Sequence, residues 1–199
     1  MSQPATFGCI LAGGASRRMG EDKAAVMLGG RRLIDHVADR LRPQCAEVMV
    51  AGPSSSAVLA ATGLAVVDDA VAGGLGPLAG IASALRRAVG AFDFVVTTPV
   101  DTPFLPTDLV ARLQAGRGGA AVVHAASGER IHYATALWST ALAADLEAAL
   151  VRDGVRRIEA FAARHPTGRV WWSTRAGDPF ENLNTPADLA RAEARLRRG

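Results

Sequence analysis

Cysteine and lysine are scarce in this chain of 199 residues. Its two cysteines, Cys9 and Cys45, form no C-x-x-C pair, which excludes a disulfide framework and a recognisable zinc site. No apolar run reaches the ~18–20 residues of a membrane span. The first residues lack the basic segment of a signal peptide. These absences predict a soluble globular protein of the cytoplasm with no membrane partner.

Basic residues slightly outnumber acidic ones. The chain carries 22 basic and 19 acidic residues, a formal net charge of +3. The arginines are scattered rather than gathered in one stripe, so nucleic acid is not an expected partner. Lys23 is the single lysine among the basic residues, which makes its position informative.

Short apolar segments alternate with amphipathic ones along the whole chain. Strands are expected over Phe7–Ala12, Val48–Ala51, Leu64–Val67, Phe92–Val100, Ala120–His124, Ala134–Leu137 and Val170–Ser173. Helices are expected over 33–41, Pro77–Val89, Thr107–Leu113, Ala141–Leu150, Val155–Ala163 and after Pro186. This alternation predicts an α/β fold, a three-layer, mostly parallel, doubly wound sheet of Rossmann-like type. The length fits a single domain over residues 1–199.

Three of the expected strands end in residues that suit ligand binding. Gly13-Gly14, Asp68-Asp69 and Asp101 each follow an apolar segment directly. In open parallel sheets, ligands bind beyond the carboxyl ends of the strands. We therefore expect the functional site at this edge of the sheet.

The segment 11–23, LAGGASRRMGEDK, is rich in glycine and in basic side chains. Glycine lets the backbone point N–H groups at an anion, and arginine and lysine bind phosphate oxygens. The segment fits neither the Walker A motif nor the dinucleotide-binding motif. An exposed basic loop is the alternative, but the placement of the single lysine, Lys23, favours a triphosphate site.

Asp101 closes an otherwise apolar strand. A buried carboxylate is unfavourable without a partner, so Asp101 is expected in a helix cap, at a solvent-filled strand end or on a metal ion. A neighbouring phosphate loop favours Mg²⁺, because a triphosphate arrives with a hard cation that prefers carboxylate oxygens.

Four segments together resemble the MobA family, the molybdenum cofactor guanylyltransferases. They are L-A-G-G-x-S-R-R-M-G-x-D-K from Leu11, GPLAG from Gly76, TPVDTPF from Thr98 and NLNTP from Asn182. The resemblance implies a nucleotidyltransferase that moves GMP from GTP to molybdopterin and releases pyrophosphate. Attack in line at the α-phosphorus would need no covalent enzyme intermediate.

The resemblance also implies roles for individual residues. On the nucleotide side, residues 1–105, Arg18, Lys23 and Asp101 would be catalytic, with Mg²⁺ on Asp101. GTP would be bound by Leu11, Ala12, Gly13, Lys23, Asp69 and Asp101. On the acceptor side, residues 106–199, molybdopterin would meet Arg130, His132, Asn182 and Asn184. Pro53 and Tyr133 depart from the family pattern, which has asparagine and proline there.

Two other functions remain open at this point. The chain could transfer CMP or another nucleotide, to molybdopterin or to a sugar or alcohol phosphate. It could also be a non-catalytic GTP-binding module, although Lys23 and Asp101 together favour a catalyst. Molybdenum cofactor insertion proteins or molybdoenzymes are the expected transient protein partners.

Overall fold

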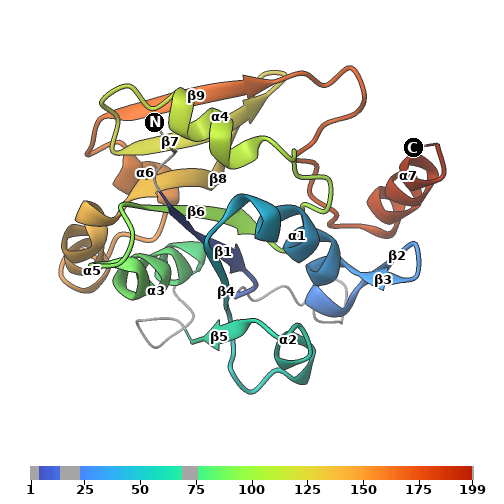
Figure 1. The fold of residues 1–199 in the computed structure, drawn as a ribbon, viewed down its shortest axis with the longest axis horizontal. Helices are drawn as coiled ribbons and strands as arrows, with labels where there is room; N and C mark the ends of the chain where they lie inside the picture. Colours follow the sequence, from blue (N-terminus) through green and yellow to red (C-terminus); the bar gives the residue numbers. More distant parts are fainter. Residues whose placement is uncertain (1–4, 14–22, 69–75, 199) are drawn as a thin grey trace.

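A central mixed sheet organises the protein, as Figure 1 shows. The computed structural model describes residues 5–13, 23–68 and 76–198. Within them, seven strands lie in the order β5-β4-β1-β6-β8-β7-β9. Four neighbouring pairs are parallel, and β8 runs antiparallel to both of its neighbours. The predicted three-layer, mostly parallel α/β fold is confirmed.

The strands lie close to where the apolar segments predict them. They are β1 (Thr6–Leu11), β4 (Glu47–Ala51), β5 (Ala65–Val67), β6 (Phe94–Pro99), β7 (Val122–Ser127), β8 (Arg130–Ser139) and β9 (Thr167–Trp172). The helices are α1 (Leu33–Leu41), α2 (Ala57–Ala60), α3 (Pro77–Ala88), α4 (Leu109–Ala115), α5 (Ala143–Val151), α6 (Ile158–Ala162) and α7 (Pro186–Leu196). None of the helices in the described residues has the length and apolar character that crossing a bilayer requires.

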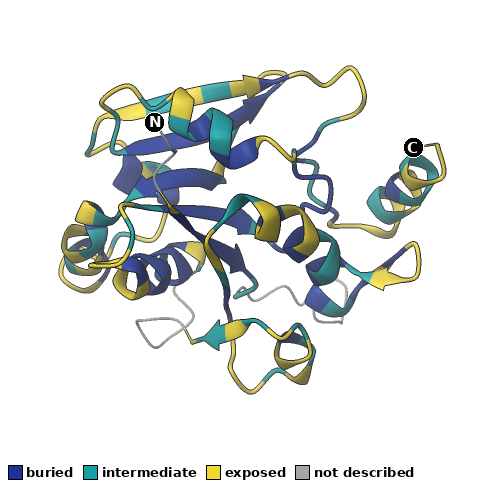
Figure 2. Ribbon diagram, in the orientation of Figure 1, coloured by how far each residue is buried: buried dark blue, intermediate teal, exposed yellow. Residues whose placement is uncertain are grey.

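Helices cover both faces of the sheet because its buried strands are apolar on both sides. Phe7, Cys9 and Leu11 of β1 pack toward α3, α5 and α6, and Ile10 packs toward α1 and α4. Figure 2 shows the buried sheet between helices whose outer faces are exposed. The two clusters make the hydrophobic core that fixes the strand ends in place.

The strand order reverses at β1. From β1 the chain builds β4 and β5 on one side, then returns to place β6 on the other side. Such a switch point leaves a crevice beyond the carboxyl ends of the two strands that flank it. Gly13 follows β1 and Asp101 follows β6, so two predicted site residues lie at this crevice.

Two hairpins differ from the expected pattern. Residues 27–32 form a small antiparallel pair, β2 (Met27–Leu28) and β3 (Arg31–Arg32), which the alternation did not predict. Its turn, Gly29-Gly30, has positive φ at both residues, a conformation that glycine adopts readily. The predicted strand Ala134–Leu137 is longer, because β8 begins at Arg130 immediately after a two-residue turn from β7.

The C-terminal helix α7 packs beside the β2–β3 hairpin rather than on the sheet, as seen at the right of Figure 1. Leu28, Phe104, Leu183 and Ala192 belong to one small apolar cluster there. This packing brings the segment that precedes α7 to the end of β6.

Candidate active site

Main-chain hydrogen bonds join the carboxyl end of β1 to the residue after β6 and to the end of β4. Val100 N–H donates to Leu11 O at 3.1 Å, and Ala12 N–H donates to Ala51 O at 2.8 Å. Leu11 is buried, whereas Ala12 and Gly13 are half-buried. Two main-chain groups of the residues predicted to bind GTP, Leu11 O and Ala12 N–H, are thus already hydrogen-bonded to neighbouring strands.

The Asp101 carboxylate lies just beyond β6 with both oxygens bonded. Lys23 Nζ donates to Oδ2 at 2.6 Å, and Asn182 Nδ2 donates to Oδ1 at 2.7 Å. Asp101 is only 7% exposed, so these partners supply the compensation that a buried charge needs. The two partners are distant side chains rather than N–H groups of the following turn, so these contacts do not support the helix-cap alternative for Asp101.

Lys23 connects the nucleotide and acceptor sides that the sequence predicted separately. It begins a short 3-10 helix, η2 (Lys23–Ala25), and its ammonium also donates to Asn184 Oδ1. Leu183 N–H donates to Asp101 O at 3.0 Å, which holds the segment between the two asparagines against β6. Four predicted residues, from both halves of the chain, therefore form one connected cluster.

A capping box keeps Asn184 in position. Thr185 is the N-cap of α7, and its hydroxyl accepts a hydrogen bond from the Asp188 N–H. Asp188 Oδ2 in turn accepts the N–H groups of Asn184 and Thr185. These hydrogen bonds, of which the one from the Asn184 N–H has the largest effect, lower the pKa of Asp188 to about 2.

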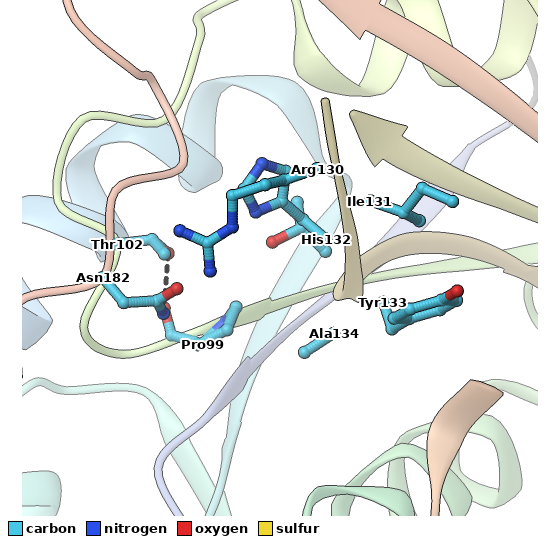
Figure 3. Close-up of a pocket in the computed structure, with 9 residues that line it drawn as sticks. Pro99, Thr102, Arg130, Ile131, His132, Tyr133, Ala134 and Asn182 are labelled. Carbon is cyan, nitrogen blue, oxygen red and sulfur yellow. Dashed lines mark hydrogen bonds between the residues drawn. The ribbon is translucent and has the colours of Figure 1, made fainter. Parts of the chain in front are cut away.

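An open cavity of about 170 Å³ lies beside this cluster, and we call it the acceptor cavity. Its lining residues come from the end of β6, the start of β8 and the segment before α7: Pro99, Thr102, Arg130, Ile131, His132, Tyr133, Ala134, Thr135 and Asn182. In Figure 3 the guanidinium of Arg130 points toward the side where Thr102 and Asn182 lie. Two predicted acceptor residues, Arg130 and His132, thus line this cavity. Asn182 lines it too and also donates to Asp101, so the cavity adjoins the Asp101 cluster.

Two predicted site residues, Arg18 and Asp69, lie outside the described residues. The preceding residue, Asp68, is described, and its carboxylate accepts hydrogen bonds from the N–H and the hydroxyl of Ser54. These bonds lower the pKa of Asp68. Asp68 therefore ties the end of β5 to the loop after β4, which is a structural role.

Sequence reasoning missed two polar residues, Ser127 and Asp178, of which the first contacts the predicted acceptor residue His132 and the second contacts Ser127. Nε2 of His132 lies 2.7 Å from the hydroxyl of Ser127, which donates to Asp178 Oδ1 at 2.8 Å. Ser127 ends β7 and Asp178 lies in the loop before α7. The available signal was the position of Asp178, four residues before Asn182.

The match to a family model decides the family. The model of the MobA-like NTP transferase domain matches residues 8–168. The chain belongs to the MobA-like NTP transferase family. The matched range includes most of β1, Lys23, Asp101 and the β7–β8 hairpin.

Similar proteins support this family membership. A Cereibacter sphaeroides protein named molybdenum cofactor guanylyltransferase is 48% identical over 195 residues, covering 96% of this chain and 97% of its own. The structure of molybdopterin-guanine dinucleotide biosynthesis protein A from Archaeoglobus fulgidus superposes with a TM-score of 0.75 at 25% identity, covering 97% and 100%. A Mycobacterium tuberculosis protein solved in complex with manganese shares the fold, with a TM-score of 0.69 at 15% identity, covering 96% and 98%.

Proposed function

We propose that this MobA-like protein transfers GMP from GTP to molybdopterin and releases pyrophosphate. The observation that carries the proposal is the cluster of Lys23, Asp101, Asn182 and Asn184, which joins the crevice at β1 and β6 to the acceptor cavity. The name of the Cereibacter relative, molybdenum cofactor guanylyltransferase, supports GTP and molybdopterin as the two substrates.

The reaction is a direct displacement at phosphorus. An oxygen of the terminal phosphate of molybdopterin bonds to the α-phosphorus of GTP, and the bond from that phosphorus to the bridging oxygen of the β-phosphate breaks. The electron pair leaves with pyrophosphate. The protein contributes position and charge rather than a nucleophile, so Lys23 and the main-chain N–H groups stabilise the charge that develops on the phosphate oxygens.

The residues at the end of β6 fit a magnesium ion that arrives with the triphosphate. Mg²⁺ is commonly held by one or two carboxylates together with substrate phosphates and water. Among the described residues, Asp101 is the carboxylate found at this point, and they contain no group of three or more side chains that could hold a metal ion. When bound, the cation neutralises negative charge on the phosphates. Lys23, which holds Asp101 Oδ2 in this structure, would then transfer its contact to a phosphate.

We assign the remaining predicted residues the roles that the family resemblance implies. Leu11, Ala12, Gly13 and Asp69 bind the nucleoside of GTP, and Arg18 binds its phosphates. Arg130, His132, Asn182 and Asn184 bind molybdopterin. The single domain thereby divides into a nucleotide-binding part, 1–105, and an acceptor-binding part, 106–199. The expected setting is the cytoplasm, with transient contact to the proteins that receive the cofactor.

Pyrophosphate release tests the function directly. The purified protein is mixed with Mg²⁺, molybdopterin and either GTP or CTP, and pyrophosphate is measured over time. Release that needs both GTP and molybdopterin is the expected result. Release with CTP at an equal rate would contradict guanylyl transfer. GTP binding without any release would instead indicate a non-catalytic GTP-binding module.

A further inference from the structure

Three polar side chains lie in series at the wall of the acceptor cavity. His132 lines the cavity, and its Nε2 is 2.7 Å from Ser127 Oγ. The Ser127 hydroxyl donates to Asp178 Oδ1 at 2.8 Å. The series therefore connects a cavity-lining imidazole to a carboxylate in the loop that leads to Asn182.

Counting donors and acceptors along the series shows which atoms carry a proton. An ionised carboxylate only accepts, and Asp178 Oδ1 also receives the N–H of Phe180 at 2.9 Å. Ser127 has one proton, which it gives to Asp178, so it can only accept from His132. Nε2 of His132 must therefore carry a proton. In the neutral ring, Nδ1 is left as an acceptor.

The order of the three groups excludes nucleophilic catalysis by the serine. In a hydrolytic triad the histidine stands between the serine and the carboxylate. Here Ser127 stands in the middle and is only 1% exposed, so it has no access to a substrate. The group at the cavity end is the imidazole.

The surroundings hold the His132 ring in place and keep it neutral. The ring packs against Phe180, which is fully buried, with the centroids 4.9 Å apart. Burial lowers the pKa of His132, and Arg130 acts in the same direction while Asp178 opposes it. At neutral pH the ring therefore presents an uncharged acceptor.

We propose that Ser127 and Asp178 are positioning residues that orient His132, so that its Nδ1 accepts a hydrogen bond from a ring N–H of the acceptor substrate. The inference rests on the proposed function, since a pterin carries such N–H groups. Arg130, in the same cavity, is suited to the acceptor phosphate because a guanidinium matches phosphate oxygens. A neutral acceptor and a cation in one cavity therefore match the two ends of a pterin phosphate.

A double-mutant cycle tests whether Ser127 and Asp178 act through His132. Ser127→Ala and Asp178→Asn are each expected to raise the KM for molybdopterin about tenfold, the effect of losing one oriented hydrogen bond. The KM for GTP should remain within about twofold, because neither residue is among those proposed to bind the nucleotide. In a His132→Ala background, neither substitution should cause a further loss.

The matched control is Asp108→Asn. Asp108 accepts a hydrogen bond from Trp172 Nε1, and Trp172 packs on the same Phe180, but this pair has no bond to His132. Asp108→Asn should leave the KM for molybdopterin unchanged. Losses that add in the His132→Ala background, or an equal rise in both KM values, would overturn the positioning role.

Nitrogen-15 NMR of His132 tests the same inference without any substrate. The free protein should show the ring protonated at Nε2 at neutral pH, and Ser127→Ala should shift the Nε2 resonance. A ring protonated at Nδ1 in the unsubstituted protein would overturn the inference. Absence of pyrophosphate release from the unsubstituted protein would instead refute guanylyl transfer, so the two failures are distinguishable.

Discussion

Lys23 and Asp101 are 78 positions apart in the chain, yet their side chains form an ion pair of 2.6 Å at the end of β6. Both are largely buried, with side-chain exposures of 18% and 9%. The ion pair joins the last residue of the glycine-rich segment 11–23 to a carboxylate just beyond β6. A triphosphate entering this crevice would meet a lysine and a carboxylate already held in place by Asn182 and Asn184.

Lys23→Arg is expected to reduce turnover about tenfold or more although the charge is kept. The ammonium is held between oxygens of Asp101 and Asn184, and a planar guanidinium distributes its donors differently and needs more room. Steady-state pyrophosphate release measures the effect. The exposed Arg197→Lys on α7 is the control for an exchange of the two basic residues and should leave turnover unchanged. Full activity in Lys23→Arg would show that any cation serves at this position.

Asp101→Asn is expected to fold normally but to lose about a hundredfold in turnover, because it removes the proposed metal ligand. That factor corresponds to about 3 kcal/mol of lost transition-state stabilisation. Asparagine keeps an oxygen for Asn182, but it removes the charge that pairs with Lys23 and that Mg²⁺ prefers. The rate is measured as a function of Mg²⁺ concentration, with thermal unfolding as the check on folding. Asp39→Asn, which breaks an exposed ion pair with Arg31, is the control. A rate within a few-fold of the original at limiting Mg²⁺ would leave the cation without its proposed ligand.

GTP with Mg²⁺ is expected to raise the melting temperature more than CTP or ATP does. A ligand that binds the folded state stabilises it in proportion to the logarithm of its affinity, about 1.4 kcal/mol for each tenfold difference at saturation. Thermal shifts at matched nucleotide concentrations measure the preference. Equal shifts with CTP and GTP would contradict guanine selectivity in the segment 11–13.

Much of the fold could be predicted because both faces of the sheet are covered. A strand that is buried on both sides reads as a continuous apolar run, so β1 and β6 were found within two residues of their bounds. The β2–β3 hairpin was missed because each strand has two residues, too few to show alternation. Its Gly29-Gly30 turn was the local signal.

The candidate site was predictable where one chain segment carries its chemistry, and not where the contact joins distant segments. Lys23 stood out as the single lysine, and Asp101 as a charge that ends an apolar strand. Ser127 and Asp178 carried no such mark, since each gains its role from a partner 5 or 51 positions away. Only the β7–β8 hairpin and the loop before α7 bring them together.

The capping box of α7 is expected to make part of the stability depend on acid pH. Hydrogen bonds from Asn184 and Thr185 hold the pKa of Asp188 at about 2, below the value of about 3.9 in an unfolded chain. The stabilisation is therefore fully present above the unfolded value and is lost as the pH falls through the folded value. Unfolding by urea between pH 2 and 7 measures this, with Asp188→Asn as the variant that lacks the charge. The stability gap between the two proteins should be constant above about pH 5 and close toward pH 2. The control Glu193→Gln, on the same helix with Arg197 at 3.9 Å, should show a smaller gap because that pair is exposed. A gap for Asp188→Asn that does not change with pH would mean that the carboxylate charge contributes nothing to the cap.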